Sequence, residues 1–138
     1  MRTAAALATL ASLQPTDGDV SSEFGQRDDV AYLRVTSATS GSRWAVVSSP
    51  GDRWFSLDVD GGFSFDHFEE ETPDEDARRV LKRLVGLAVQ YVVREPTPIK
   101  SKVLRVPIIE LPTEDGVVLL RKSLVGLLKH LFRLNRRS

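Results

Sequence analysis

The chain has 138 residues, no cysteine, 41% apolar and 28% charged residues, which is the composition of one ordinary globular domain. The absence of cysteine excludes disulfides, thiolate metal sites and cysteine nucleophiles, and it fits a reducing, cytoplasmic location. Nineteen basic residues balance nineteen acidic ones, so net charge favours binding neither to nucleic acid nor to an anionic membrane. We therefore expect residues 1–138 to form a single domain.

The first thirteen residues, Met1–Leu13, are mostly alanine, leucine and threonine. One arginine followed by a short apolar stretch is the outline of a secretory signal peptide. The stretch is only weakly hydrophobic, however, and alanine and leucine are the best helix formers, so we favour a first helix. The next segment, Gln14–Asp28, is rich in Pro, Gly, Ser and Asp and is predicted to be a connector.

Four short runs of β-favouring residues follow, separated by turn signals at Ser40–Ser42, Ser49–Asp52 and Asp60–Gly62. This spacing predicts a four-stranded antiparallel meander. The predicted strands are Asp29–Thr36, Arg43–Ser48, Arg53–Asp60 and Phe63–Phe68.

The two turns of this meander decide which side chains share a face. A four-residue turn at Ser49–Asp52 would place one apolar set beneath the helices, namely Trp44, Val46, Phe55, Leu57 and Val59. Ala45, Val47 and Trp54 would then lie on the opposite face. A two-residue turn at Gly61–Gly62 would put Phe63 and Phe65 beside Trp54, whereas a three-residue loop through Asp60 would put them beside Leu57. The apolar pattern favours the three-residue loop.

The second half of the chain predicts two more helices and a hairpin. Thr72-Pro73-Asp74-Glu75 has the order of an N-cap, an N1 proline and a capping-box glutamate, and a helical apolar pattern then runs to about Val93. Gly86 within it is interpreted as a site of close helix packing. Lys102–Leu111 is a predicted edge or bulged strand because it contains Pro107, and Val117–Leu120 is its hairpin partner. A last helix is predicted for Ser123–Leu134, with its apolar stripe at Leu124, Leu127, Leu128 and Leu131.

The element order is therefore helix, four strands, helix, two strands, helix. We expect an α+β fold in which an antiparallel meander sheet with an extra hairpin is covered by helices mainly on one face. Charge is divided unevenly along this order. Nine carboxylates and no Lys or Arg lie between Asp58 and Asp76, whereas Arg121–Ser138 has six basic residues and no acidic one.

The sequence has no catalytic motif, and His67 and His130 are far apart. Asp58-Val59-Asp60-Gly61-Gly62 begins like a calcium loop, but the fifth and sixth positions are Gly62 and Phe63, so a hairpin is the better interpretation. We expect no catalytic residues, no cofactor and no metal, and hence a protein that is not an enzyme. The alternative is a hydrolase that uses the acidic segment 58–76, including Asp66 and Glu69.

The layout, with Trp54–Phe63 leading to Thr72-Pro73-Asp74-Glu75, resembles that of the secretion-chaperone-like proteins of bacteria, including the YbjN-type group. It is also similar to that of small α+β immunity proteins that neutralise a cognate toxin. Both resemblances imply a non-enzymatic protein without cofactor or metal. They supply no functional residues.

We therefore expect a protein- or peptide-binding module that binds neither nucleic acid nor membrane, with a homodimer as one of the assemblies open to it. Trp54 would anchor the partner on the uncovered face of the sheet, because tryptophan and arginine often dominate interface energy. The remaining predicted partner-binding residues are Val47, Arg43, Arg53, Asp58 and Asp60. The alternative is that the first helix, a loop or the C-terminal segment covers this face.

Overall fold

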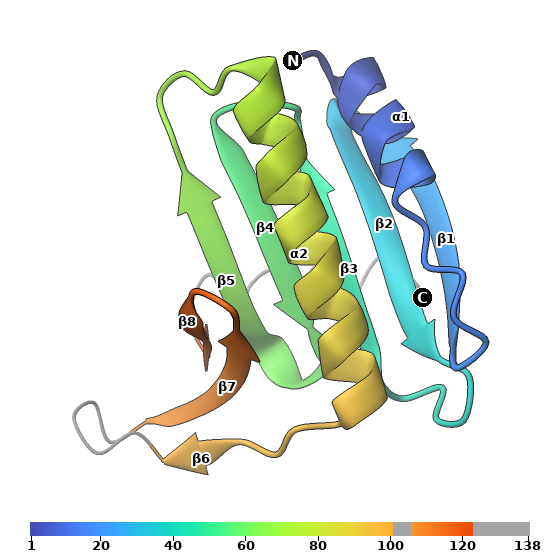
Figure 1. Ribbon diagram of the computed structural model, residues 1–138, viewed down its shortest axis with the longest axis vertical. Coiled ribbons are helices and arrows are strands. Elements are labelled where there is room, and N and C mark those ends of the chain that lie inside the picture. Colours follow the sequence, from blue (N-terminus) through green and yellow to red (C-terminus); the bar gives the residue numbers. More distant parts are fainter. Residues whose placement is uncertain (101–105, 123–138) are drawn as a thin grey trace.

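The protein is described by a computed structural model that covers residues 1–100 and 106–122. Both helices in this part of the chain lie on one face of a single antiparallel sheet of eight strands (Figure 1). The α+β class is confirmed, and the two helices of the described residues lie on one face, but the sheet has more strands than predicted. In chain order the elements are α1 (Thr3–Ser12), β1 (Val20–Arg27), β2 (Val30–Ser37), β3 (Trp44–Ser49), β4 (Trp54–Val59), the 3-10 turn η1 (Asp60–Gly62), β5 (Phe63–Phe68), α2 (Asp74–Arg94), β6 (Ile99–Lys100), β7 (Pro107–Thr113) and β8 (Gly116–Lys122).

The first five strands form a meander, and its four predicted strands are all present. The prediction that Gln14–Asp28 is only a connector is wrong, because its second half is β1, which pairs with β2 along its whole length. The two strands are joined at Asp28 and Asp29, where Asp28 has a φ of 54°. As an edge strand with most residues at least partly exposed, β1 needs few apolar residues, which is why its sequence carries little strand pattern.

The loop between β4 and β5 has the three residues that the apolar pattern favours. Asp60–Gly62 form η1, and both of its glycines have a φ of 85°, which side chains rarely adopt. Phe65 consequently lies opposite Leu57, on the face beneath α2.

The predicted pairing of β3 with β4 is wrong by three residues. Val46 lies opposite Asp58 rather than Phe55, and Val47 lies opposite Leu57. An odd shift exchanges the two faces of a strand, so Ala45 and Val47 point to the core and Trp44 and Val46 point away from it. The cause is a longer connection in which Gly51 and Arg53 have φ values of 112° and 69°. Ser49 stabilises it, because its hydroxyl accepts the Gly51 N–H and donates to the Trp54 carbonyl.

The second hairpin extends the sheet, because β8 pairs with β5 and with β7, and β7 pairs with β6. The prediction that Pro107 marks an edge strand is only partly correct, because β6 pairs with Pro107 and Ile108, whereas the rest of β7 is paired with β8 alone within the described residues. Pro107 is the first residue of β7, where a missing N–H is tolerated, and it lies opposite Lys100 of β6. The last helix predicted, Ser123–Leu134, lies outside the described residues.

Helix α2 covers the centre of the sheet with its apolar face, and Leu81, Leu84, Ala88 and Tyr91 are all buried there. Its start differs from the predicted cap: Pro73 is the N-cap residue, and the buried Thr72 hydroxyl has no hydrogen-bond partner. The helix ends at Arg94 as Glu95 enters the left-handed region, with a φ of 49°.

Gly86 lies on the exposed side of α2, and a Cβ added there would meet nothing within 4 Å. The interpretation of Gly86 as a close-packing residue is therefore wrong.

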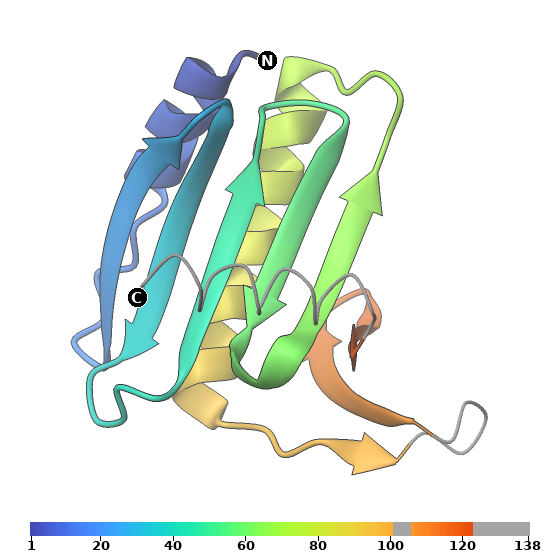
Figure 2. The same ribbon diagram turned by 180° about the vertical axis from the view of Figure 1, so that it is seen from behind.

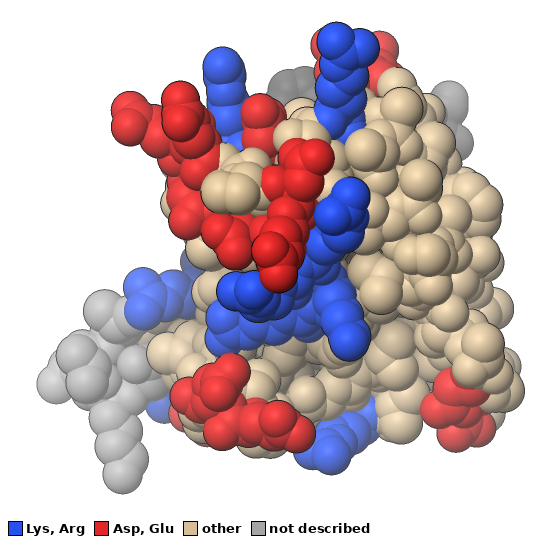
Figure 3. Space-filling model, turned by 45° about the horizontal axis from the view of Figure 1, so that its top comes forward, with Lys and Arg blue, Asp and Glu red and all other residues tan. Residues whose placement is uncertain are grey.

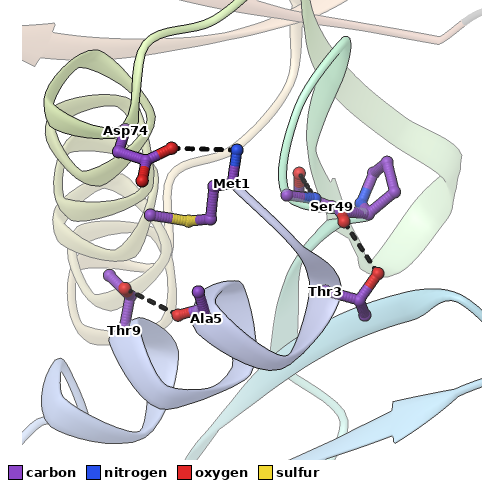
Figure 4. A network of polar contacts seen from close by, with 8 residues as sticks. Met1, Thr3, Ala5, Thr9, Ser49 and Asp74 are labelled. Carbon is purple, nitrogen blue, oxygen red and sulfur yellow. Dashed lines mark hydrogen bonds and ion pairs between the residues drawn. The ribbon is translucent and has the colours of Figure 1, made fainter.

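The N-terminal segment ties α2 to the β3–β4 connection (Figure 4). The helix predicted for Met1–Leu13 is confirmed as α1, with Ala6 and Leu10 fully buried. The Met1 ammonium lies 2.9 Å from Asp74, which lowers the pKa of that carboxyl. The Thr3 hydroxyl donates to the carbonyl of Pro50 at 2.8 Å. This arrangement leaves no room for a side chain at Gly51, because its Cβ would lie 2.5 Å from the Met1 carbonyl oxygen.

We expect Gly51→Ala to lower the free energy of unfolding by about 1–3 kcal/mol, because it combines a left-handed φ with a clash against backbone. Gly41→Ala is the matched control, since a Cβ at Gly41 meets nothing within 4 Å. Chemical denaturation of both variants checks this. Equal stabilities would show that the β3–β4 connection does not have this conformation.

Candidate protein-binding face

The face of the sheet turned away from α1 and α2, here called the open face, carries the residues of interest (Figure 2). Alternate residues of each strand point to it, as the cross-strand pairs define. In the meander these include Tyr32 and Arg34 of β2, Trp44, Val46 and Ser48 of β3, Trp54, Ser56 and Asp58 of β4, and Ser64, Asp66 and Phe68 of β5.

Of the six predicted partner-binding residues, only Trp54 and Asp58 lie on the open face within strands. Val47 is fully buried beneath α2, so its assignment to this face is wrong. Trp44 was expected in the core and instead shares the open face with Trp54. Its ring lies 5.4 Å from the guanidinium of Arg34, which is within cation–π distance.

Arg43 and Asp60 do not form a rim around Trp54, because both are engaged at the C-terminal end of α2. Arg43 donates to the hydroxyl of Tyr91 at 2.9 Å and lies over its ring at 5.3 Å. Asp60 accepts the backbone N–H of Trp44 at 3.0 Å. Burial, with the nearby Asp60 carboxylate, raises the pKa of Tyr91. These residues hold α2 to the sheet. The sixth residue, Arg53, is exposed in the loop before β4.

The centre of the open face holds a polar group that we call the serine–aspartate cluster: Ser48, Ser56, Asp58, Ser64 and Asp66. The Ser56 hydroxyl is at the middle of it, 2.7 Å from the Asp66 carboxylate and 3.1 Å from that of Asp58. Ser56 is fully buried, and Asp58 is only 6% exposed. Buried carboxylates are rare without compensating hydrogen bonds or charges, and the Ser56 hydroxyl is a hydrogen-bond donor within this cluster.

One end of the open face is aromatic, with Trp54 half-buried and Phe68 exposed. Trp54 lies directly opposite Phe68, and Phe68 is 75% exposed, the highest value among the large apolar residues described. Glu69, Glu70 and Glu71 follow Phe68 and are all exposed. We call these five residues the aromatic–acidic patch.

Two features define the surroundings of the patch. The Glu69 N–H donates to the Arg53 carbonyl at 2.9 Å. This hydrogen bond holds together the backbone segments that lie next to Trp54 and Phe68. Figure 3 shows acidic side chains gathered at this end of the molecule, next to a group of basic ones. Phe68 was not among the predicted partner-binding residues, because it is only the last residue of a predicted strand. A strand-terminal phenylalanine followed by three glutamates was the available signal.

The acidic segment 58–76 does not assemble into one site. Asp58 and Asp66 lie on the open face, Asp60 lies near the end of α2, and Glu69–Glu71 follow β5. Asp58 and Asp60 therefore do not face a common ion. Within residues 1–100 and 106–122, no group of three or more His, Asp or Glu side chains is arranged to hold a metal.

Comparison of the chain with protein-family models, curated proteins and solved structures finds no match. The resemblances in layout to secretion-chaperone-like and immunity proteins therefore stay predictions. Neither of the two described helices has the length and apolar content that crossing a membrane requires.

We expect Ser56→Ala to lower the free energy of unfolding by about 1–3 kcal/mol, because the cluster loses the single hydroxyl proton that Ser56 donates to its carboxylates. Ser21→Ala is a matched control on an exposed strand position, with an expected change within about 0.5 kcal/mol. Urea denaturation of both variants checks the difference. A Ser56→Ala protein as stable as the control would mean that the cluster contributes nothing to the fold.

Proposed function

We propose that the protein is a non-enzymatic protein- or peptide-binding module that recognises its partner through the aromatic–acidic patch. The observation that carries the proposal is the 75% exposure of Phe68 beside Trp54. Burying a phenylalanine side chain contributes about 1.5–3 kcal/mol of favourable free energy, and a partner that covers Phe68 would gain this contribution on binding.

The partner that suits this patch is a protein or peptide segment that combines apolar and basic side chains. Aromatic anchors that enter a partner's pocket supply much of the binding energy of an interface. The exposed carboxylates of Glu69, Glu70 and Glu71 would steer a basic partner and accelerate its association. Part of the neighbouring acidic charge is already neutralised, since Arg79 lies 3.5 Å from Asp76.

The patch is preorganised. Trp54 and Phe68 occupy opposed positions on neighbouring strands, and the hydrogen bond from Glu69 to Arg53 joins the chain just beyond them. A partner would therefore spend little free energy on ordering the binding residues.

Two biological roles fit such a module. A chaperone-like protein would bind basic, apolar segments of several clients, whereas an immunity-type inhibitor would bind the basic site of one toxin. The exposed run of three glutamates supports the second role as an alternative. The genes beside this one distinguish the two, because an inhibitor is encoded next to its toxin. A cytoplasmic location is part of the proposal and fits the absence of cysteine.

We expect Phe68→Ser to leave the fold intact and to weaken partner binding about 30-fold or more, the loss typical of a residue worth at least about 2 kcal/mol at an interface. Val117→Ser is the control, because Val117 is a 56% exposed apolar residue on β8. The test is quantitative affinity capture from the cells that make the protein, followed by titration of the purified partner.

A partner whose affinity falls with Phe68→Ser and with added salt, but not with Val117→Ser, supports the proposal. If no captured protein depends on Phe68, the patch is not a binding site.

A further inference from the structure

The serine–aspartate cluster is buried on a face that neither α1 nor α2 reaches. Ser48, Ser56, Asp58 and Ser64 are between 0% and 7% exposed, and Val46 between the tryptophans is 8% exposed. Figure 2 shows both described helices on the far side of the sheet. A segment that covers this face would need positive charge near Asp58 and Asp66 and apolar side chains near Val46.

The chain reaches the border of this face at the end of β8. Arg121 lies opposite Ser64 of the cluster, and Lys122 lies opposite Phe63. The residues that follow Lys122 therefore start beside the cluster, at the β5 side of the meander.

Residues 123–138 have the matching chemistry. Their leucines repeat at helical spacing, and they include Lys129, Arg133, Arg136 and Arg137 but no acidic residue. Their length is also sufficient. About 16 residues in a helix span about 24 Å, whereas the four strand spacings from β5 to β1 measure about 19 Å.

We propose that residues 123–138 of this chain cover the centre of the open face, with their leucines over Val46 and Trp44 and their positive charge near Asp58 and Asp66. The cover would extend over the serine–aspartate cluster and leave Phe68 exposed for a partner. This inference does not depend on the proposed function, because it concerns the buried centre of the face and not the aromatic–acidic patch.

A nitroxide spin label on Ser138→Cys of the full-length protein tests the proposal, because the chain has no other cysteine. The amide NMR signals of Arg34 and Val46 on the open face are expected to lose most of their intensity, while those of Arg78 and Lys82 on the exposed side of α2 keep theirs. The control is the same label on Asp115→Cys in the β7–β8 turn. Equal losses at both sets of amides, or none, would overturn the proposal.

A mixed sample identifies which chain provides the cover. Spin-labelled protein without isotope is added to isotope-labelled protein without spin label. Unchanged open-face signals support cover by the same chain, whereas signal loss in this sample would show that a second copy supplies the segment and would contradict the proposal.

Tryptophan fluorescence gives an independent measurement, because both tryptophans of the chain lie on the open face. Leu127→Asp is expected to shift the emission to longer wavelength and to increase quenching by acrylamide, while Val117→Asp leaves both unchanged. Circular dichroism establishes that each variant is folded. A folded Leu127→Asp protein with unchanged emission and quenching would also overturn the proposal.

Discussion

The pairing of β3 with β4 determines what each face of the sheet can do. Val47 lies opposite Leu57, so the face of these strands that packs against α2 is apolar except for Ser49. The other face receives both tryptophans together with Ser56 and Asp58. A shift by one residue would bury these polar groups beneath α2 and expose the apolar set, at a cost of several kcal/mol for each buried unpaired group.

The open face is divided into two regions with different physical character. Its centre is polar and buried, and the Ser56 hydroxyl lies within hydrogen-bond distance of two carboxylates there. Its end is aromatic, with Phe68 exposed, and the glutamates after Phe68 surround it with negative charge. The proposed partner binding uses this end. The buried centre is the region that we propose residues 123–138 cover.

The sequence predicted those elements whose patterns are strong. The apolar periodicity of α2, the alternation in β4 and the glycines of η1 each determine a local structure with one clear solution. β1 was not predicted, because an exposed edge strand needs no alternation of apolar residues. The N-cap of α2 was assigned to Thr72, but the helix begins after Pro73, and the Thr72 hydroxyl makes no hydrogen bond.

The candidate site was only partly predictable, because its composition depends on one connection. Ser49–Asp52 looks like a four-residue turn, yet Arg53 continues it in a left-handed conformation that sequence patterns do not reveal for a non-glycine residue. This extension moved Val47 into the core and Trp44 out of it. Trp54 and Asp58 were placed correctly because the alternation within β4 does not depend on the turn.

The most direct test of this account is the β3–β4 pairing itself, measured through backbone proton–proton nuclear Overhauser contacts in isotope-labelled full-length protein. We expect cross-strand contacts between Val47 and Leu57 and between Ala45 and Val59. Contacts between Val46 and Phe55 and between Trp44 and Leu57 would contradict it, because they would return Trp44 to the core and remove the open face described above.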